Sequence, residues 1–218
     1  MKNLRPLIVI GALLLSGLSL AQKSTVSWHY LEIDNARQKW GDFDAPGWLR
    51  YFGLDDGDIN RDGYRDLVSG RYVYLNPGGD MSLPWKRFDL GLNADGCLFT
   101  DVDHDAYADI IAEAFPNVYW NRNGTSWKPV CIGQLPPTDH VNGQGAMMAQ
   151  LIPAPKPQLV LATGDGVYAV TLPGAPDSAS NWHFKKIIDN GFDEGLCAAD
   201  FDGDGDLDIS TGLMLAGD

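Results

Sequence analysis

The feature that most constrains the fold of this chain is a short acidic segment that occurs three times. The copies read DINRDGYRDLVSG from Asp58, DVDHDAYADIIAE from Asp101 and DFDGDGDLDISTG from Asp200. The first two begin 43 residues apart, and the third begins 99 residues later, about twice that spacing. A period of this length is typical of architectures in which each repeat is one supersecondary unit. The chain is therefore expected to consist of similar units side by side.

Two further markers recur in the same order after the acidic segments. One is an alternating tetrad, found as VYLN at 73–76, VYWN at 118–121 and VYAV at 167–170. The other is a strand-like segment that begins with Trp, found as WHYLEID at 28–34, WKRFDLG at 85–91, WKPVCIG at 127–133 and WHFKKIID at 182–189. A degenerate copy of the acidic segment starts at Gln150, with Ile152 and Ala154 where further acids are expected.

The order of these markers predicts an all-β chain, a β-propeller built of four-stranded antiparallel blades. No long segment has a 3.6-residue hydrophobic period, so helices should be few. The repeat units lie near 50–91, 92–133, 141–189 and 192–218, within a domain at 22–218. This makes about three full blades and a partial one. We expect the chain to be a fragment of a longer propeller or an early-terminated product, with further blades missing.

The first 21 residues differ from the rest and are typical of a secretory signal peptide. Lys2 and Arg5 precede an apolar run at 7–20, and small residues precede the expected cleavage site. The run is short for a membrane span. We expect a secreted protein, extracellular or periplasmic, with no membrane insertion after cleavage. An uncleaved membrane anchor is the alternative.

The net charge of the chain limits the classes of binding partner that are expected. The formal net charge is −13, with 29 acidic residues. Nucleic acids and anionic lipid surfaces are therefore not expected partners. The odd cysteine count and the lack of a C-x-x-C motif argue against zinc. We expect Cys97, Cys131 and Cys197 to be small buried hydrophobic residues, with one disulfide left open because the compartment is oxidising.

The acidic segments have the pattern of metal-binding loops. Numbered from its first acid, each loop places oxygen-bearing side chains at positions 1, 3, 5 and 9, and a backbone carbonyl at position 7. Calcium takes six to eight oxygen ligands, and glycine at position 6 permits a sharp bend. The expected calcium ligands are Asp58, Asn60, Asp62, Tyr64 and Asp66 in loop one; Asp101, Asp103, Asp105, Tyr107 and Asp109 in loop two; and Asp200, Asp202, Asp204, Asp206 and Asp208 in loop four.

The loops allow three other interpretations. An EF-hand needs a bidentate acid at position 12 and flanking helices, whereas Ser69, Ala112 and Thr211 stand there between β-prone segments. Magnesium rarely uses an all-protein cage of this kind. The remaining alternative is a set of Asx turns that hold no metal. Loop two departs from the pattern at Ala106, and the degenerate copy at Gln150 is expected to bind nothing.

The pattern D-x-[DN]-x-D-G-x-x-D, followed by a short apolar strand and Gly, resembles the FG-GAP/VCBS repeat. That repeat occurs in integrin α-subunit propellers and in many secreted bacterial proteins, and the resemblance covers about residues 50–218. It implies a propeller whose calcium sits in the loop between the first and second strands of each blade. It also implies that the metal is mainly structural and that ligands bind the opposite face.

Two classes of function follow from that expected opposite face. The favoured one is a secreted calcium-binding scaffold that binds a carbohydrate or protein partner without catalysis. The alternative is a calcium-dependent sugar-active enzyme, of the polysaccharide lyase or sugar dehydratase type, with His140 and either Glu113 or Asp95 as acid–base candidates. The polar residues expected on this face are Asp95, Glu113, His140, Asn142, Gln144, Asp193 and Glu194.

Overall fold

A computed structural model describes most of the repeat region. The described residues are 27–37, 53–92, 94–123, 127–136, 145–151, 156–174, 176, 182–189 and 195–212, except for the side chains of 95–97. The chain divides into two compact units, Met1–Tyr30 and Leu31–Asp218. The predicted signal peptide at 1–21 lies outside the described residues. Within the described part, no helix has the length and apolar character needed to cross a membrane.

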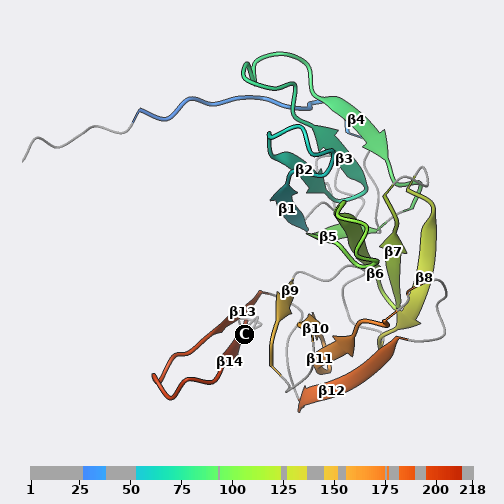
Figure 1. Cartoon of the computed structure of the whole chain (residues 1–218), viewed down its shortest axis with the longest axis vertical. Coiled ribbons are helices and arrows are strands. Elements are labelled where there is room, and N and C mark those ends of the chain that lie inside the picture. The colour runs from blue at the N-terminus through green and yellow to red at the C-terminus, as the bar shows by residue number, and fades with distance from the viewer. Residues whose placement is uncertain are drawn as a thin grey trace, which may run out of the picture. The chain divides into compact units, whose positions relative to one another are not determined.

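The described residues form four antiparallel sheets and no helix, in which the strands lie in chain order (Figure 1). The first sheet contains β1 (Leu54–Gly57), β2 (Asp66–Ser69), β3 (Tyr72–Leu75) and β4 (Lys86–Asp89). The second contains β5 (Asp95–Thr100), β6 (Asp109–Ala114), β7 (Asn117–Asn121) and β8 (Pro129–Gln134). The third contains β9 (Ala146–Ala149), β10 (Gln158–Thr163), β11 (Gly166–Thr171) and β12 (His183–Asp189). The fourth pairs β13 (Leu196–Ala199) with β14 (Asp208–Thr211). The predicted four-stranded units are confirmed.

Neighbouring sheets pack face to face through shared cores. Val73 of the first sheet and Ile110 of the second lie in one cluster of buried side chains. Trp120 of the second sheet and Leu159 of the third lie in another. The first strands of successive sheets are also in contact, β1 with β5, β5 with β9 and β9 with β13. This arrangement is the one expected of consecutive blades.

Burial along the strands reflects this stacking. The second strand of the first sheet, β2, alternates between buried and half-buried residues. In contrast, every residue of β10 is buried, and β6 is buried along all but its last residue. The second and third sheets have neighbours on both faces, so β6 and β10 are buried along nearly their whole length rather than at alternate residues. The sequences DIIAEA and QLVLAT therefore mark the interior sheets.

The expected Trp strand at 28–34 is absent, because residues 27–37 form no strand. Alternation alone does not make a strand when no partner strand pairs with it. The part of this segment that belongs to the second unit is held by side chains instead. Asp34 accepts hydrogen bonds from the Tyr74 hydroxyl at 2.8 Å and from Arg87 Nη1 at 2.7 Å. These contacts tie residue 34 to the outer half of the first sheet.

Candidate functional site

The three acidic loops occupy equivalent places in three sheets. Each connects the first strand of a sheet to the second: loop one joins β1 to β2, loop two joins β5 to β6, and loop four joins β13 to β14. Loop two contains both buried and exposed residues, and loop four is exposed apart from its last residue, Asp208. Loops with the same connection and sequence pattern can thus be compared position by position.

The aspartate at position 1 organises each loop by accepting backbone hydrogen bonds across it. In loop one, Asp58 accepts from the N–H groups of Asp62 at 3.0 Å and Gly63 at 2.9 Å. In loop two, Asp101 accepts from Asp105 and Ala106, both at 3.1 Å. In loop four, Asp200 accepts from Gly203 at 2.7 Å, Asp204 at 3.1 Å and Gly205 at 3.0 Å. The same carboxylate therefore closes the same turn three times.

Positions 3 and 5 add Asx turns inside the same loop. The position-3 side chain, Asn60, Asp103 or Asp202, accepts from the N–H of position 5 at 3.0, 3.3 and 3.1 Å. The position-5 carboxylate, Asp62, Asp105 or Asp204, accepts at 2.9 Å from the N–H of position 7, which is Tyr64, Tyr107 or Asp206. These bonds fix the alternate side chains on one side of the loop, since each one curls back over its own backbone.

The aspartate at position 9 is the structural anchor of the loop. Asp66 and Asp109 are fully buried at the start of β2 and β6. Asp66 accepts from the N–H of Ile59 at 3.0 Å and of Asn76 at 2.8 Å, while Asp109 accepts from Val102 at 3.2 Å and Asn123 at 2.8 Å. Each therefore ties its loop to the turn after the third strand. In loop four, Asp208 makes the first of these bonds, with the N–H of Phe201 at 2.9 Å.

Burial changes the acidity of these anchors. Removal from water raises the pKa of Asp109 to about 6, and the backbone N–H of Asn123 offsets only part of that effect. Burial likewise raises the pKa of Asp66, against the hydrogen bonds from Asn76 and Ile59. Nearby loop carboxylates add to the shift in both cases, Asp103 for Asp109 and Asp62 for Asp66. A cation in the loop would reverse these effects, because it favours the ionised form.

Two positions of each loop have a left-handed backbone, one more than the sequence indicated. Position 6 has φ of 91° at Gly63, 72° at Ala106 and 96° at Gly205. Position 4 has φ of 61° at Arg61, 60° at His104 and 79° at Gly203. The only hint in the sequence is Gly203, because an L-residue at this position carries a steric cost that glycine avoids.

Substituting Ala106 by glycine is expected to stabilise the chain by about 1 kcal/mol. A left-handed alanine costs about 1–2 kcal/mol, and the greater freedom of glycine in the unfolded chain returns part of the gain. The matched control is Gly205→Ala in loop four, which should lose a similar amount. Chemical denaturation of both variants measures the two shifts. Equal stability of Ala106→Gly and the parent chain would contradict the loop conformation.

Carboxylates converge in two of the loops. One oxygen from each of Asp101, Asp103 and Asp109 lies within 4.8 Å of the others, and so does one from each of Asp200, Asp202 and Asp204. In loop one, the corresponding position 3 is an amide, and Asn60 Nδ2 donates to Asp62 at 2.9 Å. These oxygen-only donor sets fit the ligand preference of calcium. Arg122 already forms an ion pair with Asp103, so loop two is partly neutralised by the protein itself.

The degenerate third loop keeps the anchor of the others in an uncharged form. Gln158 stands at position 9 and is buried. Its side-chain oxygen accepts from the N–H of Leu151 at 3.1 Å, as Asp66 does from Ile59, and its Nε2 donates to the carbonyl of Lys156 at 2.8 Å. An amide thus closes the loop without a negative charge. The repeat pattern does not single out Gln158, because the pattern is defined by carboxylates.

The candidates for the opposite face are mostly beyond the described residues. His140, Asn142, Gln144, Asp193 and Glu194 lie outside them, as does the side chain of Asp95. Glu113 is fully buried in β6. The turn between β10 and β11 holds a different polar group, in which Asp165 accepts from Thr163 Oγ1 at 2.7 Å and Lys186 Nζ at 3.1 Å. Both predicted acid–base pairs include His140 and therefore lie outside the described residues.

The cysteines differ from the expectation of burial. Cys131 and Cys197 are exposed free thiols, and the side chain of Cys97 lies outside the described residues. Both exposed residues sit on strands, so alternation places their side chains on a solvent face.

Comparison with known proteins identifies no relative, so a function can be assigned only from the sequence and the loops. The chain matches no family model and no curated protein.

Proposed function

We propose that this chain is a calcium-binding β-propeller repeat protein of the FG-GAP/VCBS type, exported from the cell, that acts as a binding scaffold for a carbohydrate or protein partner. Calcium in loops one, two and four would be structural. Each ion would offset repulsion among the carboxylates and fix the connection between the first two strands of a sheet.

The observation that carries the proposal is the repetition of one hydrogen-bond pattern in three loops. In each loop, both carboxylate oxygens at position 1 accept hydrogen bonds from the loop backbone. One side-chain oxygen at position 3 and one at position 5 do the same. Carboxylates held this close in the metal-free chain repel one another, which is a cost unless a cation compensates. The degenerate loop has no acids, and Gln158 stands at its position 9 where the other three loops have aspartate. This supports the interpretation, because a loop without clustered carboxylates needs no cation to offset their repulsion.

Among the candidates for the opposite face, Glu113 is the one whose side chain the structure describes, and its position favours a scaffold over an enzyme. Glu113 is completely buried within a strand that is covered on both faces. A group that exchanges protons with a substrate has to reach it within hydrogen-bond distance. We therefore assign no catalytic role to Glu113.

Calorimetric titration of the metal-free chain with calcium tests the proposal. We expect uptake of about three ions, with the weakest site at loop two, where Arg122 competes for Asp103. Asp204→Ala should lose one site, because it removes one of the three converging carboxylates of loop four. The control Asp80→Ala removes an acid whose hydrogen bonds are local, to Ser82, and should keep all sites.

No uptake by a folded sample would overturn the metal assignment, and the loops would then be Asx turns alone. Equal uptake of magnesium in competition would overturn the identity of the ion.

A further inference from the structure

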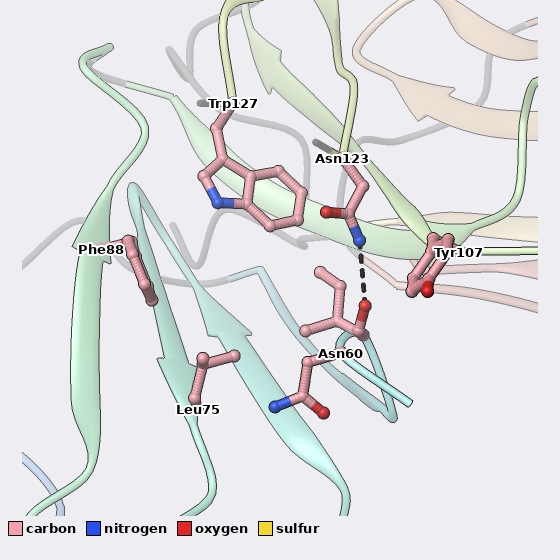
Figure 2. A pocket seen from close by; sticks show the side chains of 7 residues that line it. Asn60, Leu75, Phe88, Tyr107, Asn123 and Trp127 are labelled. Atoms are coloured by element: carbon pink, nitrogen blue, oxygen red, sulfur yellow. Dashed lines mark hydrogen bonds between the residues drawn. The ribbon is translucent and has the colours of Figure 1, made fainter. Parts of the chain in front are cut away.

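A small cavity lies between the first and second sheets, at the end of the sheets that carries the acidic loops. Its volume is about 290 Å³. Phe88 of β4 and Trp127, just before β8, line it from the two sheets, and Leu75 at the end of β3 lies below both in the view of Figure 2. Ile59, which is buried, belongs to the shared core of the two sheets. The cavity is thus a gap in the packing of two neighbouring repeats.

The next junction along the chain shows how such a gap is closed. In the tetrads VYLN and VYWN, Leu75 of the first sheet corresponds to Trp120 of the second. Trp120 is buried and its ring lies 6.3 Å from that of Trp182, the Trp that precedes β12 as Trp127 precedes β8. Trp120 and Trp182 both belong to the core between the second and third sheets. The cavity therefore exists where the repeat has Leu75 in place of a tryptophan.

The lining has a specific chemistry. Three aromatic side chains, Phe88, Tyr107 and Trp127, combine with two amides, Asn60 and Asn123, and no lining residue carries a charge. Asn123 is fixed because its Nδ2 donates to the carbonyls of Ile59 at 2.9 Å and Ala108 at 3.1 Å. Its oxygen points toward Trp127 in Figure 2. Apolar walls with a few placed hydrogen-bonding groups are typical of small-molecule sites.

We propose that this cavity binds one neutral pyranose ring of a carbohydrate. Such a ring has apolar C–H faces that pack against aromatic rings and hydroxyl groups that pair with amides, which can both donate and accept. The volume is at the lower end of the range for ligand pockets, which suits a single ring. The acidic loops beside the cavity disfavour an anionic ligand.

Two features of the aromatic residues support a binding role. Trp127 has a left-handed backbone with φ of 57°, a conformation that is uncommon for a bulky side chain. Backbone outliers of this kind cluster at ligand sites. Arg61 lies over the ring of Tyr107, with its guanidinium carbon 5.2 Å from the ring centroid. The rings are therefore positioned by the protein before any ligand arrives.

This carbohydrate site rests on the proposed scaffold function. It places the ligand at the end of the sheets that carries the acidic loops, not at the opposite face. Asn60 is position 3 of loop one and Tyr107 is position 7 of loop two, so the cavity shares two residues with the proposed calcium loops. Calcium binding is expected to strengthen carbohydrate binding by fixing these residues.

Saturation-transfer NMR on the full chain, with methyl glycosides of glucose, galactose and mannose as probes, tests the inference. We expect transfer to at least one probe, with a dissociation constant that rises at least tenfold on removal of calcium. Leu75→Trp should abolish the transfer, because it introduces the residue that fills the next junction. Trp127→Gly should also abolish it. Glycine relaxes the left-handed backbone, which offsets part of the packing that the core loses with the indole.

The matched control is Trp85→Ala, which removes the Trp of the same segment in the first repeat. The indole of Trp85 donates to the carbonyl of Met81 and does not line the cavity, so its loss should leave the transfer unchanged. Calcium titration of each variant separates the two proposals, because Leu75→Trp should keep its calcium sites. Transfer that persists in Leu75→Trp, or no transfer to any probe, would overturn the carbohydrate site. Preferential binding of choline would also overturn it, in favour of a cationic ligand.

Discussion

Raising the pH of the metal-free chain from 4 to 7 is expected to lower its free energy of unfolding by roughly 2 kcal/mol through Asp109. The pKa of this carboxyl is raised from 3.8 to about 6 by burial. Between these two values the unfolded chain loses a proton that the folded chain keeps, so stability falls as the pH rises. One pKa unit corresponds to about 1.4 kcal/mol, and the loss is complete above the folded pKa.

Urea denaturation at several pH values, with a chelator present, measures this effect. The control is Asp109→Asn, which removes the titrating group, so its stability should fall less steeply between pH 4 and pH 6. Identical slopes for the two chains would contradict the assignment to Asp109. If calcium binds loop two as proposed, saturating calcium should reverse the trend, because the ion binds the ionised carboxylate and stabilises the folded chain more at higher pH.

Gly133→Ala is expected to destabilise the chain by about 1–3 kcal/mol, the usual cost of overpacking a core. A methyl group at this position of β8 would lie 2.5 Å from Cζ of Phe184 and 3.0 Å from Cδ2. Phe184, on β12, packs against the core shared by the second and third sheets, so its ring is confined. Thermal and chemical denaturation measure the loss.

A double-mutant cycle identifies the contact as the cause. In a Phe184→Ala background, Gly133→Ala should cost little, because the ring it would strike is gone. Gly174→Ala is the matched control: nothing lies within 4 Å of a Cβ there, so stability should be unchanged or slightly higher. A full-size loss from Gly133→Ala without the Phe184 ring would contradict the packing explanation.

The repeat pattern was sufficient to predict the sheets because each strand is specified locally. The VY tetrads and the acidic segments mark where strands begin and turns occur, and these positions coincide with β2, β3, β6, β7, β10, β11 and β14. The segment at 28–34 has the same alternation but forms no strand. The alternating pattern depends only on neighbouring residues. A strand also needs a partner strand to pair with, and whether one is present depends on the rest of the fold.

The candidate metal loops were predictable for the same reason. Residues at positions 1, 3, 5 and 9 interact with backbone groups a few residues away, so spacing alone places Asp58, Asp101 and Asp200 at the closing position. The left-handed backbone at Arg61 and His104 was not predictable, because most residues with these side chains adopt ordinary conformations.

The sequence by itself determined the local units of this protein: four sheets, their turns and the acidic loops, since these depend on short-range periodicity and hydrogen bonding. Only the tertiary structure decided the burial that raises the pKa of Asp109, the contact of Gly133 with Phe184 and the cavity beside Leu75. Each of these arises where one repeat packs on the next. Packing depends on the volumes of side chains from distant parts of the chain, which no local pattern records.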